Sequence, residues 1–148
     1  MALAVVLLLG GGALAVSRYY AASTTAGEDA MSAAHDAIPQ VFSYDPPSVD
    51  DQIATTQGLM TGQFKNDYAQ LVRTVVDPGA KTQQVAVQTG VTKESVISAS
   101  PDQVELLLFI NRTIERPGDS EPALTGDRIR VTMQHQNGQW LISKITRV

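Results

Sequence analysis

The chain has 148 residues, no cysteine and a formal charge of −4 at pH 7. Without cysteine it has no disulfide, no thiolate metal site and no thiol nucleophile. Its acidic balance, with 15 Asp and Glu against 11 Lys and Arg, disfavours nucleic acid as a partner.

The first seventeen residues, Met1 to Ser17, are apolar or small and carry no charged side chain. Extended past Arg18 to Ala22, this segment predicts a transmembrane anchor over residues 1–22, with the arginine and two tyrosines at the membrane interface. A cleaved signal peptide is the alternative, because Ala13-Leu14-Ala15 offers a cleavage site, although no basic residue precedes the apolar run. Charge alone leaves the orientation open. Residues 23–148 then have the length of one ordinary domain.

Helical spacing follows the apolar segment. Over Ala21–Ile38 the positions of Met31, Ala34 and Ile38 predict a helix that continues from the membrane and ends at Pro39. Ser48-Val49-Asp50-Asp51 resembles a capping box, with aspartate in place of glutamate, and predicts a short helix toward Met60.

A third helix is predicted after Thr61, which we expect to cap it. Its sustained apolar stripe is formed by Phe64, Tyr68, Leu71, Val72 and Val75. The period changes from 3.6 to 2 after Asp77-Pro78-Gly79, so the chain divides there into a helical half and a strand half.

The second half predicts strands. Short alternating runs cover Val85–Val91 and Glu94–Ala99, and Val104–Glu115 has apolar residues on both faces, as a central strand does. A polar loop, Arg116–Gly126, precedes a hairpin. The hairpin joins Asp127–Gln136 to Gln139–Thr146 through Asn137-Gly138. We expect an α+β fold in which three helices precede a four-stranded, mostly antiparallel sheet.

Residues for chemistry are sparse. His35 and His135 lack ligand partners at metal-site spacing, and no serine sits in a Gly-x-Ser-x-Gly elbow. We predict no catalytic residue, no metal site and no cofactor. Tyr44, Tyr68 and Trp140 are the candidate pocket residues: the tyrosine hydroxyls suit a cavity, whereas Trp140 is interpreted first as a core anchor and second as a ligand contact.

Two motifs support a family resemblance. Thr61-Gly62-Gln63-Phe64 followed by Tyr68, and the ending Gly138-Gln139-Trp140-Leu141-Ile142, together with Tyr44-Asp45 and the apolar N-terminus, resemble the Mce-associated membrane proteins of actinobacteria. Such members commonly carry a longer, charged cytoplasmic segment ahead of the anchor, which this sequence does not show.

The resemblance implies a fold like nuclear transport factor 2, in which three helices and a strongly bent sheet enclose a cone. It also implies a single-pass cell-membrane protein with its domain outside the cytoplasm. Its partners would be subunits of a mammalian cell entry (Mce) transport complex, which moves lipids or sterols, and a lipid is a possible ligand. The function implied is accessory and non-enzymatic, stabilising or assembling that complex.

Two other classes remain. A type IV secretion-like scaffold subunit also combines a membrane anchor with this fold and works through protein contacts. A small-ligand or isomerase-type cone would use an aspartate base and a tyrosine across an apolar pocket, and Asp45, Tyr44 and Tyr68 are the only set available for that chemistry.

Overall fold

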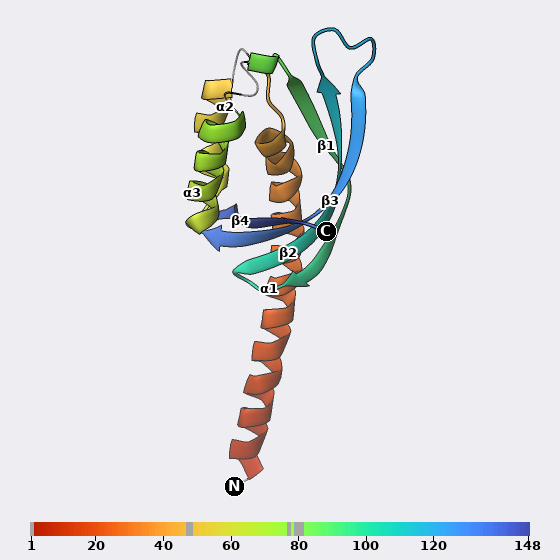
Figure 1. Ribbon diagram of the computed structural model, residues 1–148. Coiled ribbons are helices and arrows are strands. Elements are labelled where there is room, and N and C mark those ends of the chain that lie inside the picture. The colour runs from red at the N-terminus through yellow and green to blue at the C-terminus, as the bar shows by residue number, and fades with distance from the viewer. Residues whose placement is uncertain (1, 47–48, 77, 79–81) are drawn as a thin grey trace.

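Helices come first in the chain and strands second in the computed structural model, which describes residues 2–46, 49–76, 78 and 82–148 (Figure 1). The helical elements are α1 (Ala2–Phe42), α2 (Val49–Thr56), η2 (Gln57–Leu59), α3 (Gly62–Leu71) and η3 (Val72–Val76). The strands are β1 (Ala86–Ala99), β2 (Gln103–Glu115), β3 (Ala123–Gln136) and β4 (Gln139–Arg147). This confirms the α+β fold.

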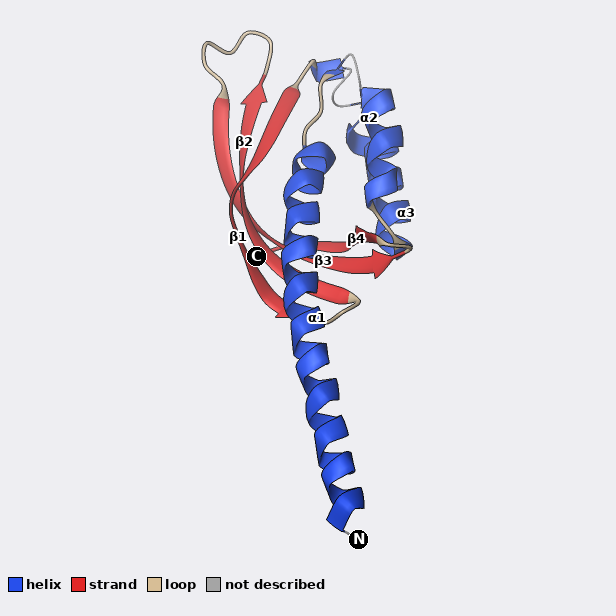
Figure 2. Cartoon of the chain, turned by 180° about the vertical axis from the view of Figure 1, so that it is seen from behind, coloured by secondary structure: helices blue, strands red, loops and turns tan. Residues whose placement is uncertain are grey.

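The sheet has the order β1-β2-β3-β4, and each strand runs antiparallel to its neighbours. Its four strands are those expected, but the runs predicted over Val85–Val91 and Glu94–Ala99 are one strand, β1. Register shifts between Val91 and Lys93 and between Val96 and Ser98 mark bulges in that strand. Bulges bend a strand and increase its twist, and the sheet is strongly curved in Figures 1 and 2.

The core lies on the concave face of the sheet. Side chains alternate along β2, so Val104, Leu106, Leu108 and Ile110 are buried there, together with Ile129, Val131 and Met133 of β3. The central position predicted for β2 is confirmed. The apolar residues on both faces of β2 suggested that both faces are covered. The helices pack on one face only, and Phe109 on the outer face remains 39% exposed.

Helix α1 lies against the concave face of the sheet (Figure 2). Small residues make this close approach possible, since Ala26, Ala30 and Ala34 are buried and a Cβ added at Gly27 would lie 3.5 Å from a methyl of Val96. The N-terminal part of α1 extends away from the sheet (Figure 1).

The prediction that Pro39 ends this helix is wrong. α1 continues to Phe42, and the Ser43 backbone N–H donates to the Pro39 carbonyl at 2.9 Å. A proline inside a helix loses one backbone hydrogen bond and crowds the carbonyl four residues earlier. Burial of Ile38 and Val41 in the core on either side of Pro39 offsets this cost and stabilises the extra turn.

Two helix N-caps were predicted from the sequence, Ser48 for α2 and Thr61 for α3. Ser48 lies outside the described residues, so the capping box is not described, although α2 forms where a helix was expected. Thr61 does occupy the N-cap position of α3, but its hydroxyl makes no cap hydrogen bond. It donates instead to Oε1 of Gln136 at 2.7 Å, which ties the start of α3 to the end of β3.

The hairpin between β3 and β4 has the predicted turn. Asn137 and Gly138 both have positive φ, 52° and 79°, as a type I′ turn requires. Gln136 pairs with Gln139 across it. The preceding loop is shorter than expected, because β3 begins at Ala123.

The N-terminal boundary predicted at residue 22 falls inside one continuous helix, α1. Among the helices that the structure describes, none is sufficiently long and apolar to cross a membrane. The anchor over residues 1–22 and the domain over residues 23–148 stay predictions.

Candidate functional site

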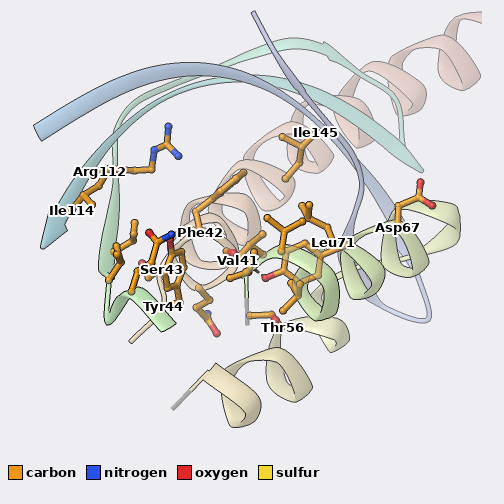
Figure 3. A pocket seen from close by; sticks show the side chains of 18 of the residues that line it. Val41, Phe42, Ser43, Tyr44, Thr56, Asp67, Leu71, Arg112, Ile114 and Ile145 are labelled. Atoms are coloured by element: carbon orange, nitrogen blue, oxygen red, sulfur yellow. Dashed lines mark hydrogen bonds between the residues drawn. The ribbon is translucent and has the colours of Figure 1, made fainter. Parts of the chain in front are cut away.

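A cavity of about 860 Å³ lies between the end of α1, α3 with η3, and the concave face of the sheet (Figure 3). Most of its described lining is apolar, including Val41, Phe42, Leu71, Val75, Val87 and Ile145. The space between the helices and the curved sheet is therefore hollow at this end. A volume of this size falls within the range of about 300–1,000 Å³ that small-molecule sites occupy.

The chain after α1 forms one wall of this cavity by joining the edge of the sheet. Tyr44 and Val87 exchange backbone hydrogen bonds of 2.9 and 2.8 Å, so Tyr44 lies beside β1. The Thr89 hydroxyl donates to the Phe42 carbonyl at 3.1 Å, and its backbone N–H donates to the Ser43 hydroxyl. These contacts hold the end of α1 at a fixed distance from the strand.

Tyr68 connects α3 to α1 across the cavity. Its hydroxyl donates to the Val41 carbonyl at 3.0 Å. Burial raises the pKa of Tyr68, and a hydrogen bond with the Thr56 side chain opposes that rise. The phenol is therefore protonated at neutral pH, and its proton is held in a contact between two helices.

The three candidate pocket residues do not lie together. Tyr44 and Tyr68 both line the cavity, whereas Trp140 is not among its lining residues. Trp140 is half-buried against the core and pairs across the hairpin with His135, with ring centres 5.0 Å apart. The register of β4 places Trp140 beside the hairpin turn, at the opposite end of that strand from Ile145.

Sequence analysis missed a charged cluster on the concave face, formed by Arg112, Asp127 and Arg147. Both arginines bind the Asp127 carboxylate, and Nε of Arg147 is 2.9 Å from Oδ1. The hydrogen bond from Arg147 is the largest cause that lowers the pKa of Asp127, and the charge of Arg112 acts in the same direction against burial. Arg112 also lines the cavity.

A signal for this cluster existed in the alternation of β2. Because Leu106, Leu108 and Ile110 face the core, Arg112 must face the same side. A charged residue at the next position of a buried apolar series indicates an ion-pair partner or a binding site, because burial of an unpaired charge is unfavourable. Its partner, Asp127, belongs to the next strand along the chain, where it pairs directly with Ile110, two residues before Arg112.

Acid pH is expected to weaken the fold through Asp127. Because the folded pKa is depressed, the carboxylate stabilises the fold above its ordinary pKa of about 3.9, and this contribution is lost as the pH falls through the lower folded value. Asp127→Asn should therefore flatten the loss of melting temperature on acidification. Thermal unfolding from neutral pH to about pH 2 measures this, with Asp119→Asn in the exposed loop as the control. An unchanged acid slope in Asp127→Asn contradicts the assignment.

The other residues weighed from sequence lie elsewhere. His35 is exposed on α1, and its Nδ1 is 3.0 Å from Oε2 of Glu94 on β1. Asp45 is not among the residues lining the cavity; Asp67 is, and it accepts a hydrogen bond from the Gln63 amide at 2.8 Å. Within the described part of the chain, no three His, Asp or Glu side chains are grouped as a metal site requires.

Comparison by sequence finds a similar protein in Mycobacterium tuberculosis. The outer membrane protein Rv1973 is 34% identical to this chain over 122 residues, which cover 82% of this chain and 76% of Rv1973. No protein-family model matches the chain.

Comparison by structure finds domains with the same fold. An IcmL-like type IV secretion system protein of Legionella pneumophila superposes with a TM-score of 0.68 at 12% identity, over 80% of this chain and 88% of that one. A periplasmic fragment of TraM gives 0.65 at 10% identity, over 81% and 95%. At these identities the likeness shows a shared fold.

Proposed function

The chain belongs to the family of the outer membrane protein Rv1973 of Mycobacterium tuberculosis, and from this membership we propose that it is a non-enzymatic scaffold subunit of the cell envelope. An N-terminal anchor over residues 1–22 holds its α+β domain outside the cytoplasm. The domain, a cone like that of nuclear transport factor 2, acts by binding other proteins of a transport or secretion complex.

The observation that carries this proposal is the fold shared with envelope domains. Four fifths of the chain superpose on a type IV secretion system protein and on a periplasmic fragment. Membership of an outer membrane protein's family supports the same compartment. The sequence of the apolar segment supports the anchor.

The continuous α1 suits an anchored scaffold. The helix that starts at Ala2 is the same helix whose residues Ala30, Ala34 and Ile38 are buried under the sheet. A membrane segment at one end of this helix would hold the domain at a set distance from the bilayer, without a flexible linker.

The outer face of the sheet suits protein contacts. Phe109 is paired in register with Lys93 on β1 and Arg128 on β3, and Leu107 is paired with Arg130. We call these five residues the outer-face patch. No described helix covers them. Arg130 is ion-paired with Glu105 at 3.6 Å, so the exposed Phe109 beside Lys93 and Arg128 is the part that matches the composition of protein interfaces, with an acidic partner surface as its complement.

The cavity supports the non-enzymatic part of the proposal. An isomerase-type reaction needs a carboxylate base facing the pocket, and Asp45 is not in the lining. Asp67 is exposed and bonded to Gln63, and the Tyr68 hydroxyl is held by the Val41 carbonyl. The proton of the Tyr68 hydroxyl is therefore already used in a contact within the protein.

An Mce-type lipid transport complex is the second candidate for the complex in which this scaffold acts. The sequence resemblance suggests it, and the apolar cavity is the structural observation that favours it. Both candidates require the same anchored scaffold, so partner identity separates them.

Site-specific crosslinking tests the scaffold proposal. A photoreactive phenylalanine analogue is placed at Phe109 in the full-length protein, and crosslinked products from native membranes are identified by mass spectrometry. The matched control carries the analogue at Leu71, an exposed residue on the cavity side. We expect subunits of one envelope complex to be captured from Phe109 and not from Leu71.

The identity of the captured subunits shows which of the two complexes contains this protein. Secretion-type subunits support the first candidate, and Mce-type subunits support the second. Capture of no envelope complex at Phe109, or equal capture at both positions, contradicts a scaffold that binds through the outer-face patch.

A further inference from the structure

The cavity has opposite charges at its two ends. Figure 3 shows Arg112 and Asp67 on opposite sides, with Leu71 and Val41 between them. Arg112 projects from β2, and Asp67 belongs to α3. The cavity thus offers an apolar middle and one cationic end formed by the sheet.

The cationic end holds more positive charge than its carboxylate neutralises. Arg112 and Arg147 share the single carboxylate of Asp127. Arg116 also lines the cavity, and its Nη1 is 3.8 Å from Oδ2 of Asp119 in an exposed loop. The cluster of Arg112, Asp127 and Arg147 therefore carries one more positive charge than negative. Arg147 is largely exposed and is not in the lining, so Arg112 and Arg116 are the cations that the cavity presents.

Arg112 also has an unused donor. Its Nε is buried and has no hydrogen-bond partner among the described residues. Leaving a buried donor of a charged group unpaired is unfavourable, and guanidinium groups match the geometry of carboxylates and phosphates. An anion placed beside Arg112 would pair with guanidinium N–H groups that Asp127 does not use and would offset the net positive charge.

We propose that this cavity binds a single-chain amphiphile, with its aliphatic chain between α1 and α3 and its anionic group beside Arg112. The volume of about 860 Å³ suits one chain, since it lies in the range of sites for small ligands. A fatty acid carboxylate and a lysophospholipid phosphate present the same chemistry. This site is separate from the outer-face patch, so it goes beyond the scaffold function.

Photolabelling of the full-length protein in phosphatidylcholine nanodiscs tests this site. The probes are stearic acid with a diazirine in its chain, the matching stearyl alcohol, and lysophosphatidylglycerol with the same labelled chain. Labelled peptides are mapped by mass spectrometry. We expect the acid to label peptides of α3, η3 and the end of α1 about tenfold more than the alcohol. Stronger labelling by the acid identifies a free fatty acid as the ligand source, and stronger labelling by the lysolipid identifies a lipid headgroup.

Variants separate the charge from the cavity. Arg112→Gln should reduce labelling by the acid to the level of the alcohol, while Arg112→Lys retains most of the preference. Leu71→Trp fills the cavity and should reduce labelling by every probe. Leu124→Trp makes the same replacement at an exposed position outside the cavity and should change nothing.

Thermal melting of each variant shows whether it is folded. If Arg112→Gln does not fold, Arg112→Lys still tests the cation, because it keeps the positive charge. Equal labelling of the wild-type cavity by acid and alcohol overturns the anionic part of the proposal. Absence of label from the cavity peptides, or label that Leu71→Trp leaves unchanged, overturns the site itself.

Discussion

Replacing Leu106 by alanine is expected to lower the free energy of unfolding by about 2–5 kcal/mol, the largest effect of any substitution considered. Leu106 is fully buried in β2, between Val96 of β1 and Val131 of β3. Alanine removes its apolar burial and leaves a cavity that flanking strands on both sides cannot close. Denaturant unfolding monitored by circular dichroism measures the change.

The control for Leu106 is the same change at Leu124. That side chain is 78% exposed at the start of β3, so Leu124→Ala should change the stability by no more than about 0.5 kcal/mol. A cost at Leu106 no larger than that at Leu124 would show that the concave face does not carry the core.

Enlarging Ala34 to leucine is expected to destabilise the fold by about 1–3 kcal/mol. Ala34 is fully buried where α1 lies on the sheet, and the neighbouring Ala30 is equally buried. A larger side chain has no free volume here, so it must separate α1 from the strands. Because α1 also forms a wall of the cavity through Val41, the amphiphile proposed above should bind Ala34→Leu less well.

Ala22→Leu provides the matched control on the same helix. Ala22 is exposed, so a leucine there should leave the thermal stability of the domain unchanged. Equal melting temperatures for Ala34→Leu and Ala22→Leu would mean that α1 is not closely packed on the sheet.

Local patterns predicted much of the fold. The alternation of Leu106, Leu108 and Ile110 identified β2, and Asn137-Gly138 identified the last hairpin, because both signals depend on residues a few positions apart. The end of α1 was mispredicted at Pro39, where burial of Ile38 and Val41 overrides a local rule.

The candidate site was predicted only in part. Tyr44 and Tyr68 line one cavity, but Trp140 lies at the hairpin beside His135. The spacing of residues in the sequence does not predict the distance between β4 and α3. Arg112 was overlooked because a single arginine in a strand is ordinary until its neighbours are known.

Residues close together in the chain are enough to set the order of helices and strands, the hairpin turn and the apolar N-terminal segment. The packing of the helices on the sheet sets which face of β2 is covered, where the cavity lies and which charges line it. Those features depend on contacts between distant segments, such as Tyr68 with Val41 and Thr61 with Gln136. Such contacts form only when the curved sheet brings α1 and α3 together over its concave face.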